Sequence, residues 1–80
     1  MKIRFFKYGI IKDLLPEEAE EQILKDGTLA FHFLHEMKKK HPRLSELASL
    51  KMAVNDEYLQ DDVELKEGDE VLFIPPVSGG

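Results

Sequence analysis

The 80-residue sequence contains no cysteine, and this absence excludes several kinds of chemistry. Without thiols the chain forms no disulfide, carries no thiol nucleophile and offers no thiolate metal ligand. Secreted domains of this size usually depend on disulfides, so we expect a cytoplasmic protein. The segment Met1–Lys7 has neither an uninterrupted apolar stretch nor a small-residue cleavage site, and it therefore predicts no secretory signal.

Long hydrophobic runs and positive charge are also scarce. No apolar run approaches the roughly 20 residues that cross a bilayer, so we expect no membrane partner. Sixteen acidic residues against 11 Lys and Arg give a net charge of −5. Nucleic acid is excluded as an expected partner, because phosphate binding needs a basic surface. With 42% hydrophobic residues, the chain predicts one small domain with a modest core.

The first half of the chain predicts two strands and one main helix. Alternating apolar and β-branched residues predict a strand over Lys2–Tyr8, and Glu17–Asp26 is interpreted as a second strand, hairpinned to the first. Between them, Ile10–Leu15 predicts a single helical turn. Helical spacing of apolar residues predicts the main helix over 29–40, with Thr28 as its N-cap.

The second half predicts short elements separated by turns. A short second helix is expected at Leu44–Leu50, and a third strand at Lys51–Val54. A tight turn then leads to a return strand at Tyr58–Leu59. The continuous apolar run Val71–Ile74 is typical of a covered, central strand. The sequence therefore predicts an α+β fold, with a mixed four- to five-stranded sheet packed on one main helix.

Strand alternation separates residues that face this helix from residues that face away. The predicted inward set is Ile3, Phe5, Met52, Val54, Val71 and Phe73. The predicted outward set is Phe6, Ala53, Leu72 and Ile74, with Tyr58 on the neighbouring short strand. An exposed apolar patch usually marks an interaction site, so Phe6, Tyr58, Leu72 and Ile74 are candidate docking residues. The alternative is that loops cover them, or that they are scattered on the surface.

The last six residues, Pro75-Pro76-Val77-Ser78-Gly79-Gly80, follow the final strand directly. We expect a folded domain over 1–74 and an extended, flexible tail over 75–80 that reaches on the order of 20 Å. The prolines stiffen its base, and the glycines keep its tip thin enough for a narrow tunnel. Such a tail suits activation of its terminal carboxyl, for example by adenylation. Terminal residues are also often Gly-rich without any function.

The remaining polar clusters are expected to be solvated surface. His32 and His35 share one helix face, but two histidines alone do not predict a metal site, and we expect none. His41 and the run Lys38–Lys40 are interpreted as a solvated helix end, with a role in meeting an acidic partner left open. The glutamates at 17, 18, 20 and 21 are likewise interpreted as a solvated segment.

Nearly the whole chain resembles the MoaD family, the small sulfur-carrier subunits of molybdopterin synthase in the ThiS/MoaD superfamily. The resemblance is carried by Gly68-Asp69-Glu70-Val71 followed by Phe73-Ile74-Pro75-Pro76-Val77-Ser78-Gly79-Gly80. Phe5-Phe6 and His41-Pro42-Arg43-Leu44 are also similar. Lys12-Asp13 stands where family members often have Arg-Glu, so any contact made by that Arg is in question. The resemblance implies a ubiquitin-like β-grasp fold.

The resemblance also implies a mechanism in which the carboxyl of Gly80 is the sulfur attachment point. A MoeB-like enzyme would adenylate Gly80 with ATP, and a sulfurtransferase would convert it to a thiocarboxylate. The tail Pro75, Pro76, Val77, Ser78, Gly79 and Gly80 would then enter the active site of a MoaE-like large subunit in a heterotetramer. There it would donate sulfur for the molybdopterin dithiolene. The chain itself would bind no cofactor and supply no catalytic residue, as a non-catalytic subunit of a sulfurtransferase.

Other functions remain open at this point. The carrier could donate sulfur to thiamine or cysteine synthesis, although ThiS-like chains usually lack the Pro-Pro-Val-Ser lead-in. A different class is a ubiquitin-like modifier, in which Gly80 forms isopeptide bonds to lysines. A binding module with an inert tail is a further alternative. The sequence identifies neither the source organism, nor molybdenum versus tungsten, nor the oligomeric state.

Overall fold

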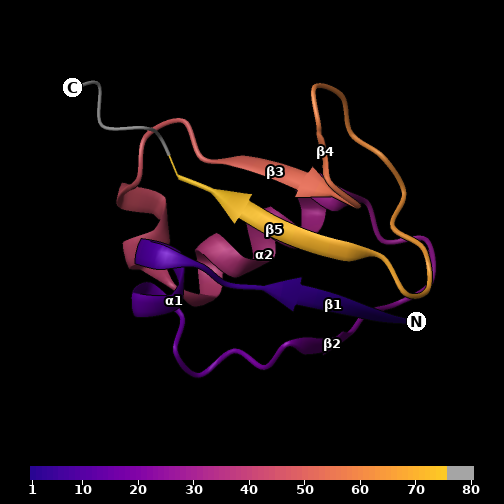
Figure 1. The fold of residues 1–80 in the computed structure, drawn as a ribbon, viewed down its shortest axis with the longest axis horizontal. Coiled ribbons are helices and arrows are strands. Elements are labelled where there is room, and N and C mark those ends of the chain that lie inside the picture. Colours follow the sequence, from indigo (N-terminus) through magenta and orange to yellow (C-terminus); the bar gives the residue numbers. More distant parts are fainter. Residues whose placement is uncertain (76–80) are drawn as a thin grey trace.

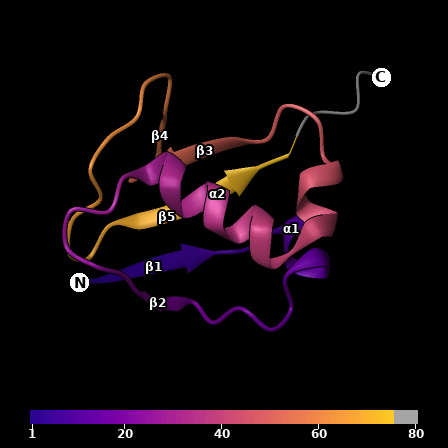
Figure 2. The same ribbon diagram turned by 180° about the vertical axis from the view of Figure 1, so that it is seen from behind.

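Five strands form one mixed sheet, and one main helix lies across a single face of it (Figures 1 and 2). The computed structural model describes residues 1–75. The elements in chain order are β1 (Lys2–Phe6), α1 (Gly9–Leu14), β2 (Glu21–Ile23), α2 (Ala30–Lys40), the 3₁₀ helix η1 (Pro42–Glu46), β3 (Lys51–Val54), β4 (Glu57–Tyr58) and β5 (Glu70–Ile74). The strand order is β2-β1-β5-β3-β4. Among the strand pairs within residues 1–75, β1–β5 is parallel and the other three are antiparallel. The predicted α+β architecture is confirmed, and the run Val71–Ile74 is central as expected.

The core lies between α2 and the inner face of the sheet. All six residues predicted to face the helix belong to it: Ile3, Phe5, Met52, Val54, Val71 and Phe73. Three aromatic rings form its centre, with Phe5 5.6 Å from Phe33 and 4.8 Å from Phe73 between ring centroids. Burial of these rings removes the largest apolar surfaces of the chain from water, so this face of the sheet supplies most of the stability.

Three predicted strands have other bounds in the structure. β1 ends at Phe6 rather than Tyr8, and β4 lies one residue earlier than predicted, at Glu57–Tyr58 rather than Tyr58–Leu59. β2 covers only Glu21–Ile23 of the predicted stretch Glu17–Asp26. The chain before β2 leaves the sheet because the side chain of Glu18 turns inward toward α2 and is buried there.

The predicted start of the main helix was wrong by one residue. Leu29 occupies the N-cap position, without a side-chain capping bond, and α2 begins at Ala30. The hydroxyl of Thr28 donates instead to the carbonyl of Lys25 at 2.6 Å, so Thr28 closes the preceding turn. The helix ends at His41-Pro42 as predicted.

The second helix predicted at Leu44–Leu50 is absent from the described part of the chain. A 3₁₀ helix occurs earlier, at Pro42–Glu46. Proline is favoured in the first turn of a helix, because its φ is already suitable and its missing N–H would have no intrahelical partner there. Leu47, with φ of −79° and ψ of 120°, is extended and ends this helix, and Ser49, with φ of 55°, follows in the left-handed region.

The tight hairpin between β3 and β4 fixes which residues of these two strands are paired. Asn55 and Asp56 have φ of 51° and 68°, the left-handed conformation of a tight two-residue hairpin turn. The Asn55 side chain also donates to Asp69 and accepts from the Glu70 backbone N–H, both at 2.9 Å. These bonds tie the turn to the start of β5. The tight turn predicted at this position is confirmed.

The division into a domain (1–74) and a tail (75–80) stays a prediction. β5 ends at Ile74, where the division was placed, but residues 76–80 lie outside the described part of the chain. Within residues 1–75, none of the helices has the length and apolar character needed to cross a membrane.

Candidate functional site

The central strand β5 brings the chain to one end of the sheet. It pairs with β1 on one side and β3 on the other, so its position is held by ladders on both edges. Its last residue, Ile74, and the following Pro75 are half-buried. This end of the molecule also carries α1 and η1, as both ribbon views show (Figures 1 and 2). A segment that continues from Pro75 therefore begins at a rigid point of the fold.

A row of apolar side chains crosses the outer face of the sheet beside this point. Phe6 pairs with Leu72, Leu72 with Ala53, and Ala53 with Tyr58. Paired residues point to the same side of a sheet, so these four side chains form one continuous row across four strands. Three of the four predicted docking residues lie in it. The fourth, Ile74, lies two residues after Leu72 and therefore on the same face. We call Phe6, Leu72, Ala53, Tyr58 and Ile74 the outer apolar face.

Exposure differs along the outer apolar face. Tyr58 is 71% exposed, whereas Ala53 is only 5% exposed although it lies outside the main core. Phe6, Leu72 and Ile74 are half-buried. Side chains that are partly covered by their neighbours hold fixed positions and still keep apolar surface for a partner.

A groove of about 560 Å³ lies where β5 ends. Its lining joins two predicted docking residues, Tyr58 and Ile74, to Pro75 and Leu59. Polar atoms of Ser49, Lys51 and Gln60 complete it. The groove thus connects the outer apolar face to the base of the tail. The residue types of Ser49, Lys51 and Gln60 do not by themselves predict a place in this groove. The folding of the chain around the β3–β4 hairpin brings them there.

Aromatic and basic groups border Phe6 on β1. The guanidinium carbon of Arg4 lies 4.9 Å from the centroid of the Phe6 ring, and the Tyr8 ring stacks on Phe6 at 6.5 Å. Lys12 lines a recess of about 370 Å³ that also includes Phe6 and Tyr8. Tyr8 was missed as a docking candidate. The sequence did contain an indication, because alternation along the predicted strand Lys2–Tyr8 places Tyr8 on the same side as Phe6.

The other end of the outer face carries ion pairs. Lys2 pairs with Glu21 at 2.8 Å, and Arg4 pairs with Glu20 at 2.9 Å and Glu70 at 3.6 Å. The hydrogen bond to Glu21 raises the pKa of Lys2, and the bond to Glu20 raises that of Arg4. These exposed pairs contribute little stability, but they separate a charged half of the face from the apolar half.

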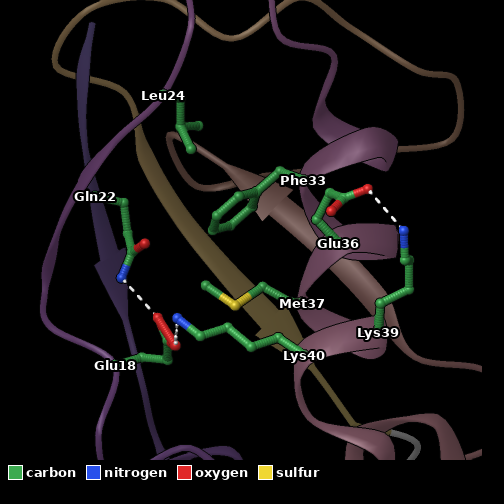
Figure 3. Close-up of a pocket in the computed structure, with 8 residues that line it drawn as sticks. All are labelled: Glu18, Gln22, Leu24, Phe33, Glu36, Met37, Lys39 and Lys40. Atoms are coloured by element: carbon green, nitrogen blue, oxygen red, sulfur yellow. Dashed lines mark hydrogen bonds and ion pairs between the residues drawn. The ribbon is translucent and has the colours of Figure 1, made fainter.

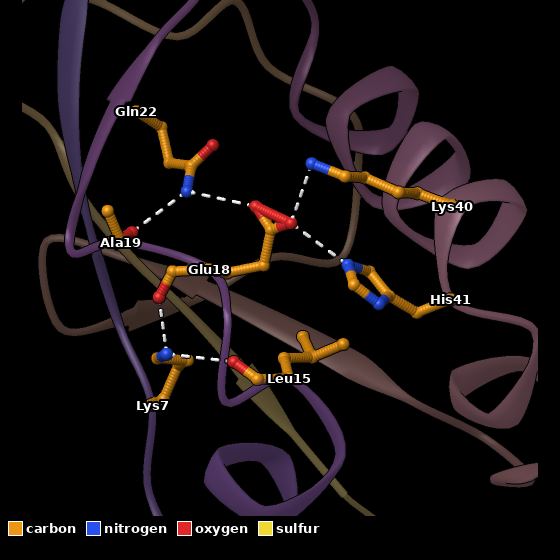
Figure 4. A network of polar contacts seen from close by, with 7 residues as sticks. All are labelled: Lys7, Leu15, Glu18, Ala19, Gln22, Lys40 and His41. Carbon is orange, nitrogen blue, oxygen red and sulfur yellow. Dashed lines mark hydrogen bonds and ion pairs between the residues drawn. The ribbon is translucent and has the colours of Figure 1, made fainter.

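One prediction about the polar clusters was wrong. Glu18 was expected to be solvated, yet it is 7% exposed and lies between β2 and the end of α2 (Figure 4). Its carboxylate lies 2.8 Å from the Lys40 ammonium and 2.9 Å from His41 Nε2, and accepts a bond from Gln22 at 3.3 Å. The Lys7 ammonium donates to the Glu18 carbonyl. Sequence spacing could not reveal this network, because residues 18 and 40 meet only in the folded chain.

The network changes the acidity of Glu18. Burial disfavours the charged carboxylate, but hydrogen bonds from Lys40 and His41 outweigh burial and lower its pKa from 4.5 to about 2. His41, with a side chain that is 13% exposed, is therefore not the solvated residue that the sequence indicated, whereas Lys40 pairs with Glu18 and stays 66% exposed. His32 and His35 do lie at the surface, with His32 3.8 Å from Glu36. Within residues 1–75, histidine, aspartate and glutamate form no group of three or more that could hold a metal ion.

The six tail residues can be placed only in part. Pro75 lies at the groove, next to Ile74. Pro76, Val77, Ser78, Gly79 and Gly80 lie outside the described residues. The predicted roles of these five residues therefore stay predictions.

Comparison with known families identifies the chain. The model of the ThiS family matches residues 8–80, which include all of the elements after β1 and the terminal Gly-Gly. The chain belongs to the ThiS family. The family resemblance expected from the tail motif is confirmed, and the β-grasp fold that it implied agrees with the sheet and helix described above.

Relatives with curated names match this ThiS-family chain over its whole length. The molybdopterin synthase sulfur carrier subunit of Mycobacterium tuberculosis is 30% identical, over 100% of this chain and 99% of the relative. The protein of the same name from Chlamydomonas reinhardtii is 34% identical over 100% of both chains.

Two solved structures are similar to the structure of this chain. SAMP1 from Haloferax volcanii matches over 100% of both chains with a TM-score of 0.76, and at 18% identity this likeness shows the fold alone. A Pyrococcus furiosus chain, provisionally assigned as subunit 1 of the molybdopterin converting factor, covers 95% of both chains. It has a TM-score of 0.70 and 30% identity. The ubiquitin-like β-grasp is thus confirmed as the fold of this chain.

Proposed function

We propose that this chain carries sulfur for molybdopterin synthase, as a thiocarboxylate on Gly80. A MoeB-like enzyme first adenylates the Gly80 carboxylate with ATP, and a sulfurtransferase then supplies sulfur in place of the adenylate. The tail Pro75–Gly80 enters the active site of a MoaE-like large subunit and donates the sulfur to the molybdopterin precursor. Names of full-length relatives support the sulfur-carrier class, because both relatives are molybdopterin synthase sulfur carrier subunits.

The observation that carries the proposal is the position of Pro75. It follows a central strand held on both edges and lines the groove that also contains Tyr58 and Ile74. A partner that covers the outer apolar face would therefore hold the base of the tail at a fixed point. Fixing one end of a short segment reduces the entropy lost when its tip enters a catalytic centre.

In this mechanism the carrier supplies no acid, base or metal. The domain supplies affinity through Phe6, Tyr58, Leu72 and Ile74, and the tail supplies the reacting atoms. The partner supplies the catalytic groups. Pro75 and Pro76 suit the exit from the sheet, because neither can donate to a strand ladder and both restrict the backbone at the base of the tail.

The test is a mass measurement on the full chain. The protein is incubated with ATP, a MoeB-like activating enzyme, a sulfurtransferase and a sulfur donor, and its intact mass is recorded. We expect a gain equal to the replacement of one oxygen by one sulfur, located at Gly80 by fragmentation. A variant lacking Gly80 should show no gain, whereas Glu17→Gln, at an exposed position outside the tail, should behave as the unmodified chain does.

Three outcomes would contradict the proposal. A mass gain that survives removal of Gly80 would place the sulfur elsewhere and reject the mechanism. Lysine adducts ending in Gly-Gly on other proteins, without sulfur transfer to a pterin precursor, would favour a ubiquitin-like modifier. Sulfur transfer that supports thiamine or cysteine synthesis, but not the large synthase subunit, would keep the carrier class and change the pathway.

A further inference from the structure

The groove beside Pro75 contains a positive charge that has no partner within residues 1–75. Lys51 lines the groove, and its ladder partner Ile74 places it on the outer face of the sheet. Lys51 is exposed, and none of the ion pairs within residues 1–75 includes it. An apolar groove with one unpaired cation favours a ligand that combines apolar surface with a negative charge.

A second groove, of about 470 Å³ between β2 and α2, differs in this respect (Figure 3). Its charged side chains form two ion pairs, Glu18 with Lys40 at 2.8 Å and Glu36 with Lys39 at 3.8 Å. Each charge that lines it therefore has a partner in the same chain. Nothing in the second groove selects a charged ligand, whereas Lys51 does so in the groove at the end of β5.

The chain itself arrives at this groove at the end of β5. Ile74 and Lys51 are paired at the end of the β3–β5 ladder, and Pro75 follows at the groove. Neither Pro75 nor Pro76 can donate a backbone hydrogen bond, so both disfavour continuation of the ladder with β3. A segment that continues from Pro75 therefore starts beside the groove and does not extend the sheet.

Residues 76–80 are long enough to cross the groove. Tyr58 on β4 lies two strand spacings from Ile74 on β5, because β3 lies between the two strands. Two spacings amount to about 10 Å, and five extended residues reach about 17 Å. The additional length allows a bend over the outer face, and Gly79 and Gly80 tolerate the backbone conformations that a bend requires.

The composition of this segment matches the lining of the groove. Val77 has an aliphatic side chain, and Tyr58 and Leu59 provide apolar surface for it. In the carrier proposed above Gly80 ends the chain, so its α-carboxylate supplies a negative charge for Lys51. The apolar part and the charge of the segment thus each have a counterpart in the groove.

We propose that residues 76–80 bind in the groove of their own chain whenever no partner covers the outer apolar face. Val77 packs on Tyr58, and the Gly80 carboxylate pairs with Lys51. Ordering five residues costs conformational entropy, which keeps the contact weak enough for a partner to displace it. The contact shields the terminal carboxyl until that displacement. This inference rests on the proposed function, because it requires a free carboxylate at Gly80 and a partner on the outer face.

The test is nuclear magnetic resonance on the isotopically labelled full chain, without an activating enzyme. We expect nuclear Overhauser effects between the Val77 methyl groups and the Tyr58 ring. Lys51→Glu replaces the attraction by repulsion and should reduce these effects by about twofold or more. The matched control is Lys25→Glu, at an exposed lysine in the connection from β2 to α2, which should leave them unchanged.

A charge-neutral variant and added salt give a second measurement. Lys51→Gln removes the cation without adding repulsion, so it should reduce the same effects less than Lys51→Glu does. Raising the salt to about 0.5 M should weaken the contact in the unmodified chain, but change little in Lys51→Gln, because salt screens only the charged pair. Val77→Ser should shift the amide signals of Leu59 and Gln60, which are distant in sequence, and leave that of Ile23 in place.

Three results would overturn the proposal. The first is the absence of Overhauser effects between Val77 and Tyr58 in the unmodified chain. The second is an equal reduction in Lys51→Glu and Lys25→Glu, which would show that the charge of Lys51 plays no part. The third is Overhauser effects between labelled and unlabelled copies, which would make a second copy the occupant. Sulfur transfer to Gly80 is measured separately by mass, so either proposal can fail while the other stands.

Discussion

The two faces of the sheet have the same strands but different surroundings. On the inner face, alternate residues such as Phe5 and Phe73 are 0% and 3% exposed beneath α2. On the outer face, their neighbours Phe6, Leu72 and Ile74 keep part of their surface open. The difference shows that residues adjacent in sequence can serve stability and recognition separately, because successive strand side chains point in opposite directions.

The largest effect that tests this comparison is on stability. Phe5→Ala should lower the free energy of unfolding by about 3–5 kcal/mol, because it leaves a cavity between Phe33 and Phe73. Phe6→Ala, one residue later on the outer face, should cost less than about 2 kcal/mol, since its ring is already partly exposed. Urea unfolding followed by circular dichroism measures both. Equal losses would show that the outer face is part of the core.

A second prediction concerns Glu18, a buried carboxylate on the helix side of the sheet. The pKa of Glu18 is lowered from 4.5 to about 2 in the folded chain, so its ionised form stabilises the fold above about pH 4.5. That contribution, about 3 kcal/mol, is lost as the pH falls from 4.5 toward 2. Glu18→Gln should lower stability at pH 7 and flatten this part of the pH dependence.

The measurement for Glu18 is urea unfolding at several pH values between 2 and 7, for both proteins. Glu17→Gln is the matched control, because Glu17 is exposed and should change stability by no more than about 0.5 kcal/mol. Parallel pH curves for the unmodified chain and Glu18→Gln would show that Glu18 does not carry the acid sensitivity of the fold.

The smallest effect on stability is expected on the outer face. Tyr58→Ala should change the free energy of unfolding by no more than about 0.5 kcal/mol, because Tyr58 is 71% exposed. It should nevertheless weaken binding to a MoaE-like large subunit by about tenfold or more, as expected for an aromatic anchor. Isothermal titration calorimetry measures the affinity.

Ile23→Ala is the matched control for Tyr58. Ile23 is 72% exposed on the same side of the sheet, but it lies on β2, outside the outer apolar face. Its substitution should leave affinity for the large subunit unchanged. If both variants weaken binding equally, the partner covers the whole sheet and the boundary drawn around the outer apolar face is wrong.

Local patterns predicted the elements of this fold better than their boundaries. The apolar run Val71–Ile74 indicated a central strand, and alternating apolar residues identified the six side chains, from Ile3 to Phe73, that face the helix. Both patterns arise directly from which side chains are buried. The start of α2 was misplaced because Thr28 can bond either to its helix or to the preceding turn, and it bonds to Lys25. The helix predicted at 44–50 failed because Pro42 favours an earlier start.

The candidate site, too, was predicted only in part from the sequence. The sequence by itself determined the outer apolar residues and the family, because strand periodicity and the Pro-Pro-Val-Ser-Gly-Gly motif are both local. Only the tertiary structure decided that Phe6, Leu72, Ala53 and Tyr58 form one row, since this depends on strand order and register. It also decided that Glu18 is buried against Lys40 and that β2 lies at one edge of the sheet. Contacts between residues distant in sequence arise only when the strands pair and the helix packs, and no local pattern encodes them.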